Sequence, residues 1–191
     1  MARWQPGARE RLVLAAVDLF AEHGYDATTV TQIAERAGVT KSTFFRHFPD
    51  KRELLVAGQE TLCRLLVEGI AEAPVTATPL EAVATGLERA SSAMGPMNRE
   101  LGPRLKAAIA ASTELQERDT LKHVGLATAM TEALVSRDVP ATVAHLAAEL
   151  GVLAFKRGYT EWTNLDHDDT GLAPHVLAAL ADLRTATAAL T

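Results

Sequence analysis

The segment of residues 29–51 places the tightest constraint on the fold, because it carries signals for two short helices and the turn between them. It reads T-V-T-Q-I-A-E-R-A-G-V-T-K-S-T-F-F-R-H-F-P-D-K. Two capping boxes frame it, Thr29 with Gln32 and Asp50 with Glu53, in which the first side chain accepts from a free helix amide and the second reaches back. This layout predicts a helix-turn-helix, in which the second helix enters the major groove of DNA.

Residue spacing gives the second helix of this motif a buried face and an exposed face. Gly38 supplies the left-handed turn that ends the preceding helix. Phe44 and Phe48 are four residues apart and share one face, which we expect to pack, together with Val39, against the core. The exposed face then carries Lys41, Ser42, Phe45 and Arg46, with Thr43 and His47 beside it.

Composition favours an all-α fold around this motif. Of the 191 residues, 48% are apolar, alanine is abundant, and no segment alternates with the period of two that a strand needs. We expect a helix-turn-helix domain over residues 1–52, with a first helix from Ala8 to His23, and a body of about five to six helices over residues 53–191. The body helices are predicted at residues 51–71, 79–94, up to 111 after the Gly-Pro pairs near 95 and 102, 113–135, 143–162 and 172–190.

Charge is divided unevenly between these two parts. The net charge is −5, yet residues 1–55 carry eight Lys and Arg against seven Asp and Glu, whereas the remainder carries 11 against 17. An acidic body on a near-neutral head indicates that only a local patch of the head approaches phosphates. No apolar run reaches the roughly 18 residues of a membrane span and no signal peptide is evident, so we expect a cytoplasmic protein that does not contact membranes. The single cysteine, Cys63, excludes an internal disulfide.

From Ala27, the pattern A-T-T-V-x-x-I-A-x-x-A-G-V-x-K-x-T-F-F-R-H-F-x-x-K-x-x-L resembles the DNA-binding head of the TetR family of bacterial transcriptional regulators. The resemblance covers about residues 8–56 and joins two capping boxes, a turn glycine and an aromatic pattern. One departure is Phe45, where the family usually has Tyr. The phenol hydroxyl is missing there, so no hydrogen bond to a base or phosphate is available, while the ring can still pack on a thymine methyl group.

The resemblance, together with side-chain chemistry, implies contacts with double-stranded DNA. Contacts to bases are expected from Lys41, Ser42, Thr43 and Phe45. Contacts to the backbone are expected from Thr29, Thr31, Arg46, His47 and Lys51. Lys51 is expected to hold a phosphate with its amide and its ammonium at the start of a helix. The alternative for each single residue is structural: Thr29 caps, Lys51 is solvated, and Arg46 covers apolar surface.

The resemblance also implies two roles for the body. In the family, the last two helices of two chains pack into a four-helix bundle, so a homodimer on a palindromic operator is expected; the alternative is that these helices only close the monomer's own core. A small apolar effector, enclosed among the fourth to eighth helices, is expected to move the fourth helix and release a repressor from DNA. The candidate wall residues, each of which also suits an ordinary core, are Leu62, Leu66, Met94, Met97, Ile109, His123, Met130, Phe155 and Trp162.

Two other classes of function fit parts of the sequence. His167 and Asp168, with His145 upstream and Asp182 downstream, resemble the metal ligands of HD phosphohydrolases, although a solvated acidic loop explains the pair as well. A helical carrier that binds a ligand without DNA would explain the body and leave the head's motif without a role. The sequence therefore predicts no catalytic residue, no metal site and no cofactor.

Overall fold

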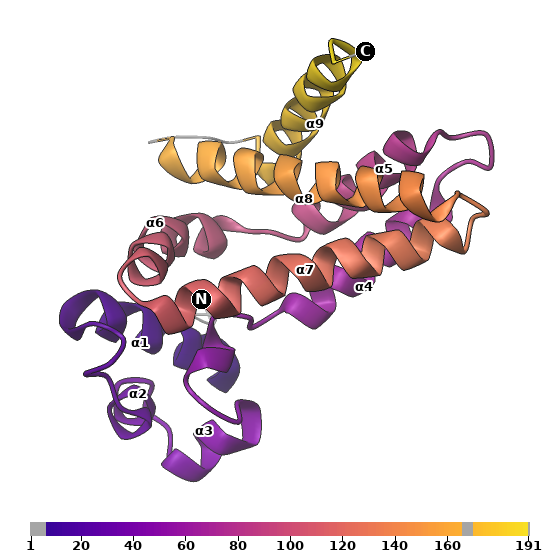
Figure 1. Ribbon diagram of the computed structural model, residues 1–191. Helices are drawn as coiled ribbons and strands as arrows, with labels where there is room; N and C mark the ends of the chain where they lie inside the picture. Colours follow the sequence, from indigo (N-terminus) through magenta and orange to yellow (C-terminus); the bar gives the residue numbers. More distant parts are fainter. Residues whose placement is uncertain (1–6, 166–169, 191) are drawn as a thin grey trace, which may run out of the picture. The chain divides into compact units, whose positions relative to one another are not determined.

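The computed structural model describes residues 7–165 and 170–190, and every regular element within these ranges is helical, which confirms the predicted all-α fold. Figure 1 shows, in chain order, α1 (Ala8–His23), α2 (Val30–Arg36), α3 (Lys41–His47), the 3-10 turn η1 (Arg52–Leu54), α4 (Gln59–Glu72), α5 (Pro79–Ser92), α6 (Pro96–Ala110), α7 (Thr113–Val135), α8 (Ala141–Asn164) and α9 (Leu172–Ala188). None of the helices within the described ranges is long and apolar enough to cross a membrane.

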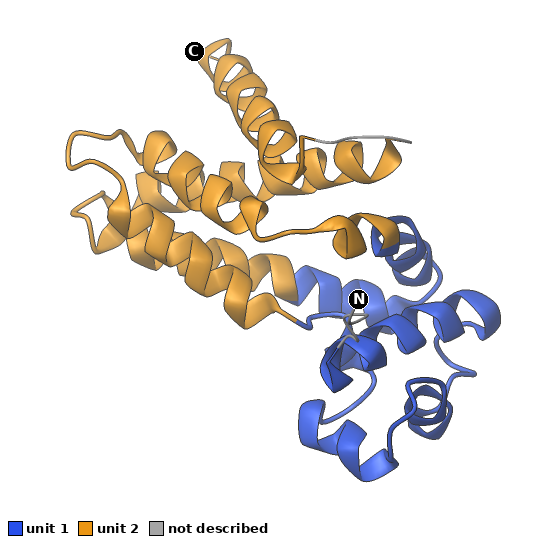
Figure 2. Ribbon diagram, turned by 180° about the vertical axis from the view of Figure 1, so that it is seen from behind, with its two compact units in different colours: residues 1–57, 101–121 blue, residues 58–100, 122–191 orange. Residues whose placement is uncertain are grey.

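The chain divides into two compact units (Figure 2). Unit 1 comprises residues 1–57 and 101–121, and unit 2 comprises residues 58–100 and 122–191. The end of α6 and the beginning of α7 therefore belong to the same unit as the helix-turn-helix. The division of roles between a DNA-binding part, residues 1–52, and an effector-binding and dimerising part, residues 53–191, stays a prediction.

The core of unit 1 is built by helical spacing around the two short helices. Leu12 of α1, Ile33 of α2 and Phe44 of α3 are each 0% exposed. Leu115, at the beginning of α7, joins the same cluster and is equally buried. A segment about seventy residues further along the chain thus completes the hydrophobic core on which α2 and α3 rest.

Unit 2 contains a second core, shared by α4, α5, α7, α8 and α9. Two glycines let α4 and α5 approach closely: a Cβ added to Gly69 would lie 2.7 Å from the Cα of Gly86 and 2.8 Å from the carbonyl oxygen of Thr85. Distances below 3.0 Å to main-chain atoms cannot be relieved by a side-chain rotation. The two helices therefore pack backbone against backbone at this point.

Two predicted helix boundaries are wrong. The fourth helix does not begin at Lys51; a short 3-10 turn follows that residue, and α4 begins only after Gly58, whose φ of 93° lies in the left-handed region and interrupts helical geometry. Conversely, α6 already begins at Pro96 and continues through Pro103. Pro96 is tolerated because the first residue of a helix needs no amide hydrogen bond.

We expect Gly69→Ala to lower the free energy of unfolding by about 1–3 kcal/mol, because the methyl group would be forced against the backbone of α5. The matched control is Gly125→Ala in α7, where the added Cβ meets only the terminal amide of the Gln59 side chain, which can turn away. Its gain in helix propensity of about 1 kcal/mol should leave stability unchanged or raised. Urea unfolding of both variants measures this, and a Gly69→Ala protein as stable as the control would contradict the close packing.

Candidate nucleic-acid interface

The start of α2 is held by the predicted capping box. The Thr29 amide donates to Oε1 of Gln32 at 2.8 Å, and the Gln32 amide donates to Oγ1 of Thr29 at 3.2 Å. The helix ends at Arg36; Gly38, two residues further on, has a φ of 64°, and the Val39 amide donates back to the carbonyl of Ala34 at 2.9 Å. The turn between α2 and α3 therefore has the left-handed geometry that the sequence predicts.

The third helix presents the expected two faces. Phe44 is 0% and Phe48 is 2% exposed, whereas Lys41, Ser42, Phe45 and Arg46 are exposed and Thr43 and His47 are half-buried. Thr40 caps the helix, since its Oγ1 accepts from the Thr43 amide at 3.0 Å. The helix therefore offers a hydroxyl, a guanidinium, an ammonium and an aromatic ring on one surface.

Phe45 is the exposed aromatic residue of this surface, with 49% of its area accessible. Its ring packs edge-on against Phe44, with centroids 5.4 Å apart, and Nζ of Lys41 lies 6.0 Å from its centroid. These contacts hold the ring beside a cation. An exposed aromatic side chain fixed in this way can cover an apolar group such as a thymine methyl.

Two of the side chains expected to contact the DNA backbone, His47 and Lys51, are half-buried, whereas Arg46 is exposed. His47 is half-buried, and its Nε2 is inaccessible and has no hydrogen-bond partner among the described residues. Lys51 turns inward, and its Nζ donates to the carbonyl oxygens of Tyr25 at 2.7 Å and Thr28 at 3.0 Å. The DNA contacts of both residues stay predictions, and the structure gives the Lys51 ammonium an intramolecular role in addition.

The turn after α3 is organised by Asp50. Its Oδ1 accepts from the amides of Arg52 at 2.8 Å and Glu53 at 3.2 Å. The hydrogen bonds from the Arg52 side chain, above all, hold the pKa of Asp50 below its usual value. The carboxylate of Glu53 does not reach back as a capping box requires, and binds instead the guanidinium of Arg118 at 2.9 and 3.0 Å.

Residues of the α6–α7 segment contact the turn after α3, the loop before α2 and α1, and local sequence patterns do not reveal these contacts. The hydroxyl of Tyr25 donates to Glu114 at 2.9 Å, and Arg52 lies 3.3 Å from the same carboxylate. Burial, and next the bond to Glu114, raise the pKa of Tyr25 above its usual value. Arg104 pairs with Asp18 of α1 at 2.5 Å. The opposite charges are visible in the sequence, but their pairing depends on the tertiary fold.

The expected effector-wall residues fall into three groups. Leu62, Leu66, Met130, Phe155 and Trp162 are buried in the core of unit 2, and Met94 packs against it. Ile109 packs against the core of unit 1. Met97 and His123 are half-buried and belong to neither cluster of described residues. Their role in binding an effector stays a prediction.

Buried polar atoms without partners mark the core of unit 2. Among the described residues, Nε1 of Trp162 and Oγ of Ser91 make no hydrogen bond, although Trp162 is 2% and Ser91 0% exposed. Beside Trp162, the phenol of Tyr159 donates to the carbonyl of Asn98 at 2.8 Å, and burial raises its pKa to about 12. Unit 2 therefore contains two buried donors, the indole of Trp162 and the hydroxyl of Ser91, whose hydrogen bonds are not made among the described residues.

The metal site of the phosphohydrolase alternative depends on His167 and Asp168, which lie outside the described residues. Its other two members, His145 and Asp182, are exposed. Within the part of the chain that the structure describes, no group of three or more His, Cys, Asp and Glu residues is placed to hold a metal ion.

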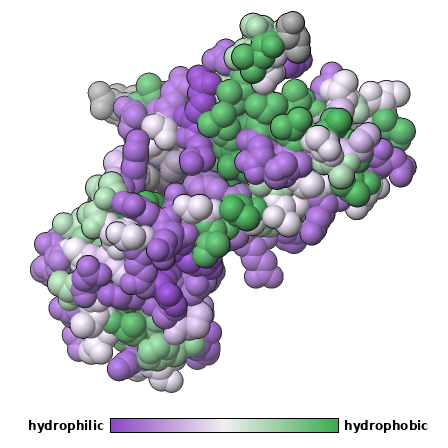
Figure 3. Space-filling model, in the orientation of Figure 1, coloured by the Kyte–Doolittle hydropathy of each residue, from purple (hydrophilic) through white to green (hydrophobic). Residues whose placement is uncertain are grey.

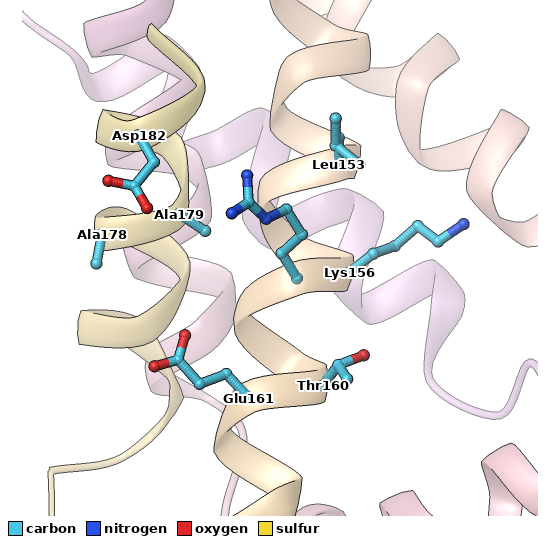
Figure 4. A pocket seen from close by; sticks show the side chains of 8 residues that line it. Leu153, Lys156, Thr160, Glu161, Ala178, Ala179 and Asp182 are labelled. Carbon is cyan, nitrogen blue, oxygen red and sulfur yellow. The ribbon is translucent and has the colours of Figure 1, made fainter. Parts of the chain in front are cut away.

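The last two helices, α8 and α9, carry an exposed apolar surface in unit 2. Val143, Leu146 and Leu153 of α8 are 44%, 59% and 44% exposed, and hydrophobic residues gather over these helices in Figure 3. A groove of about 540 Å³ lies between the two helices, and Figure 4 shows Glu161 reaching from α8 toward α9. The groove is lined by Leu153, Lys156, Arg157, Thr160, Glu161, Ala178, Ala179 and Asp182. Its charges are of both signs.

Comparison with known proteins agrees with this geometry. Residues 12–57 match the sequence profile of the bacterial regulatory proteins, tetR family. The HTH-type transcriptional regulator TcmR of Streptomyces glaucescens is 36% identical over 75 residues, which cover 39% of this chain and 33% of TcmR. The HTH-type transcriptional activator FasR of Mycolicibacterium smegmatis is 39% identical over 70 residues, which cover 37% of this chain and 32% of FasR. The similarity thus spans about a third of the length of these relatives.

A solved structure extends the likeness to most of the chain. NalD, described as the secondary repressor of the MexAB-OprM multidrug efflux pump in Pseudomonas aeruginosa, superimposes with a TM-score of 0.55 over 92% of this chain and 96% of its own. The sequences are 22% identical, so the likeness shows a shared fold.

Proposed function

On the premise that the chain belongs, through residues 12–57, to the TetR family of bacterial regulatory proteins, we propose that it is a sequence-specific DNA-binding transcriptional regulator. It acts as a homodimeric repressor that a small-molecule effector releases from a palindromic operator. The exposed face of α3 carries this proposal, because it holds a cation, hydroxyls and a fixed aromatic ring opposite a fully buried Phe44. This is the chemistry that reads base edges and thymine methyl groups in the major groove.

The contacts divide by position. Lys41, Ser42, Thr43 and Phe45 read bases, because they lie on the first turns and the exposed face of α3, and the Lys41 ammonium also neutralises a nearby phosphate. Arg46 is exposed next to them, and Thr29 and Thr31 are exposed on the first turn of α2, where hydroxyls and amides meet a phosphate. His47 completes the proposed backbone contacts. The modest net charge of the head is sufficient because these groups are concentrated on one surface.

The surface of α8 and α9 supports a homodimer. Three large apolar side chains exposed along one helix are costly in water and gain by meeting a second copy. The groove beside them offers Arg157 and Asp182, so a two-fold axis would place opposite charges of two protomers within reach. A dimer presents two copies of α3 at about 34 Å, one turn of DNA.

The core of unit 2 supports an effector. A ligand carrying a hydrogen-bond acceptor would satisfy the indole N–H of Trp162 and gain apolar contact with the core to which Trp162, Phe155 and Met130 belong. To switch the protein from mostly bound to mostly released, such a ligand must prefer the released state by about 5.5 kcal/mol. Titration of operator affinity against candidate ligands measures this preference, and an affinity that stays constant at saturation would contradict release.

Selection from a random pool of DNA tests the function directly. We expect the full-length protein to enrich a palindrome whose half-sites are about 10 base pairs apart, because each protomer presents one α3. Enrichment of a single half-site would contradict the proposed homodimer. No enrichment above non-specific binding would contradict sequence-specific recognition.

We expect Phe45→Tyr to change the preferred base at one position of each half-site by roughly tenfold in affinity, because the new hydroxyl adds a hydrogen-bonding group to an exposed ring. Thermal unfolding should be unchanged. Phe45→Leu is the control, since it keeps an apolar contact and adds no polar group. Selection with each variant measures the preference, and identical operators for the Tyr variant and the unchanged protein would show that Phe45 does not read bases.

We expect Leu146→Glu to convert the dimer into a monomer, because a charge at this site would be buried without a partner between two copies of α8. The side chain is 59% exposed within one chain, so the monomer should fold normally. Val75→Glu, at a loop position 97% exposed, is the matched control and should leave the dimer intact. Sedimentation at micromolar concentration measures both, and a Leu146→Glu dimer as stable as the control would contradict the proposed interface.

A further inference from the structure

One side chain joins the two ends of the helix-turn-helix. Lys51 follows α3, yet its Nζ donates to the carbonyl oxygens of Tyr25 at 2.7 Å and Thr28 at 3.0 Å, in the loop before α2. The same nitrogen lies 4.0 Å from the centroid of the Tyr25 ring. Two carbonyl acceptors and an aromatic face stabilise an ammonium that is partly removed from water. The ammonium therefore has partners within unit 1 before any DNA is bound.

The loop that Lys51 holds determines where α2 begins. Thr28 is 1% exposed, and its hydroxyl donates to the carbonyl oxygens of Gly24 at 2.7 Å and Leu19 at 3.2 Å. The next residue, Thr29, is the N-cap of α2. A displaced Thr28 carbonyl would thus move Thr29 and the first turn of α2, which carries the proposed phosphate contacts.

The structure around Lys51 also does not favour a phosphate beside its ammonium. The element that follows Lys51 directly is the three-residue 3-10 turn η1 and not a long helix. A single 3-10 turn has only a small dipole. The carboxylate of Asp50 already accepts from the amides of Arg52 and Glu53. An anion at this point would meet a negative group in place of free amides.

We propose that Lys51 is a positioning residue for DNA binding. Its ammonium fixes the loop from Tyr25 to Thr28, and thereby the start of α2, and it does not neutralise a phosphate. The inference rests on the proposed function, in which α2 and α3 face DNA. Phosphate charge is then neutralised by cations that are exposed in the free protein, Lys41 and Arg46 among them.

Salt dependence separates a positioning cation from a neutralising one. Each phosphate charge neutralised adds about 0.9 to the slope of log affinity against log salt concentration. Lys51→Met removes the charge and keeps an apolar stem over the Tyr25 ring. We expect it to weaken binding to the selected operator roughly tenfold at every salt concentration, with the slope unchanged. Lys41→Met, the matched control, should lower the slope by about 0.9.

A slope lowered by about 0.9 in Lys51→Met would overturn the proposal, and so would an affinity equal to that of the unchanged protein. If the Met variant does not fold, Lys51→Gln replaces it, because glutamine is also uncharged and retains donors for the loop carbonyls. The slope measured with Lys51→Gln leads to the same decision.

Hydrogen exchange in the absence of DNA gives an independent test. The amides of Gln32 and Ile33 donate to Thr29 in the first turn of α2, so loosening of the loop should speed their exchange. We expect faster exchange at these amides in the Lys51 variant, and unchanged exchange in Lys41→Met. Unchanged exchange in the Lys51 variant would overturn the proposal. Because this measurement needs no DNA, it decides the role of Lys51 even if selection shows that the chain recognises no sequence.

Discussion

Complete burial of Phe44 is the constraint on which the candidate DNA-binding surface depends. One ring in the core of unit 1 fixes the rotation of α3 about its axis, since a helix of seven residues has few other contacts to orient it. With Phe44 inward, Lys41 and Phe45 must face outward. The edge-on packing of Phe45 on Phe44 then couples the exposed ring to the buried one.

A short helix held by one face also needs support at its ends. Thr40 caps the start of α3, and Asp50 and Lys51 organise the chain after it. The next two residues, Arg52 and Glu53, pair with Glu114 and Arg118 of α7. Exposed ion pairs contribute little each, but the Glu53–Arg118 pair is bidentate and half-buried, so it adds geometric definition.

The features that the sequence predicts correctly in this region are those with local signals. The capping box at Thr29, the left-handed Gly38 and the two faces of α3 depend on spacings within a few residues, and all three are confirmed. The sequence predicts the start of α4 too early, because the leucines beyond Lys51 suit a helix, whereas the left-handed conformation of Gly58 interrupts it. The hydrophobic pattern alone does not show whether helical periodicity or a single left-handed residue determines where a helix begins.

The inward turn of Lys51 shows a different limit. Its position in the family pattern indicates a cation near DNA, but a Lys side chain is long enough to reach either a phosphate or a neighbouring loop. Which of the two it reaches depends on where the carbonyls of Tyr25 and Thr28 point, and that follows from the buried Thr28 hydroxyl and the conformation of Gly24. A cation that is already paired within the fold stabilises the structure of the surface. The attraction for phosphates must come from cations that are exposed to solvent.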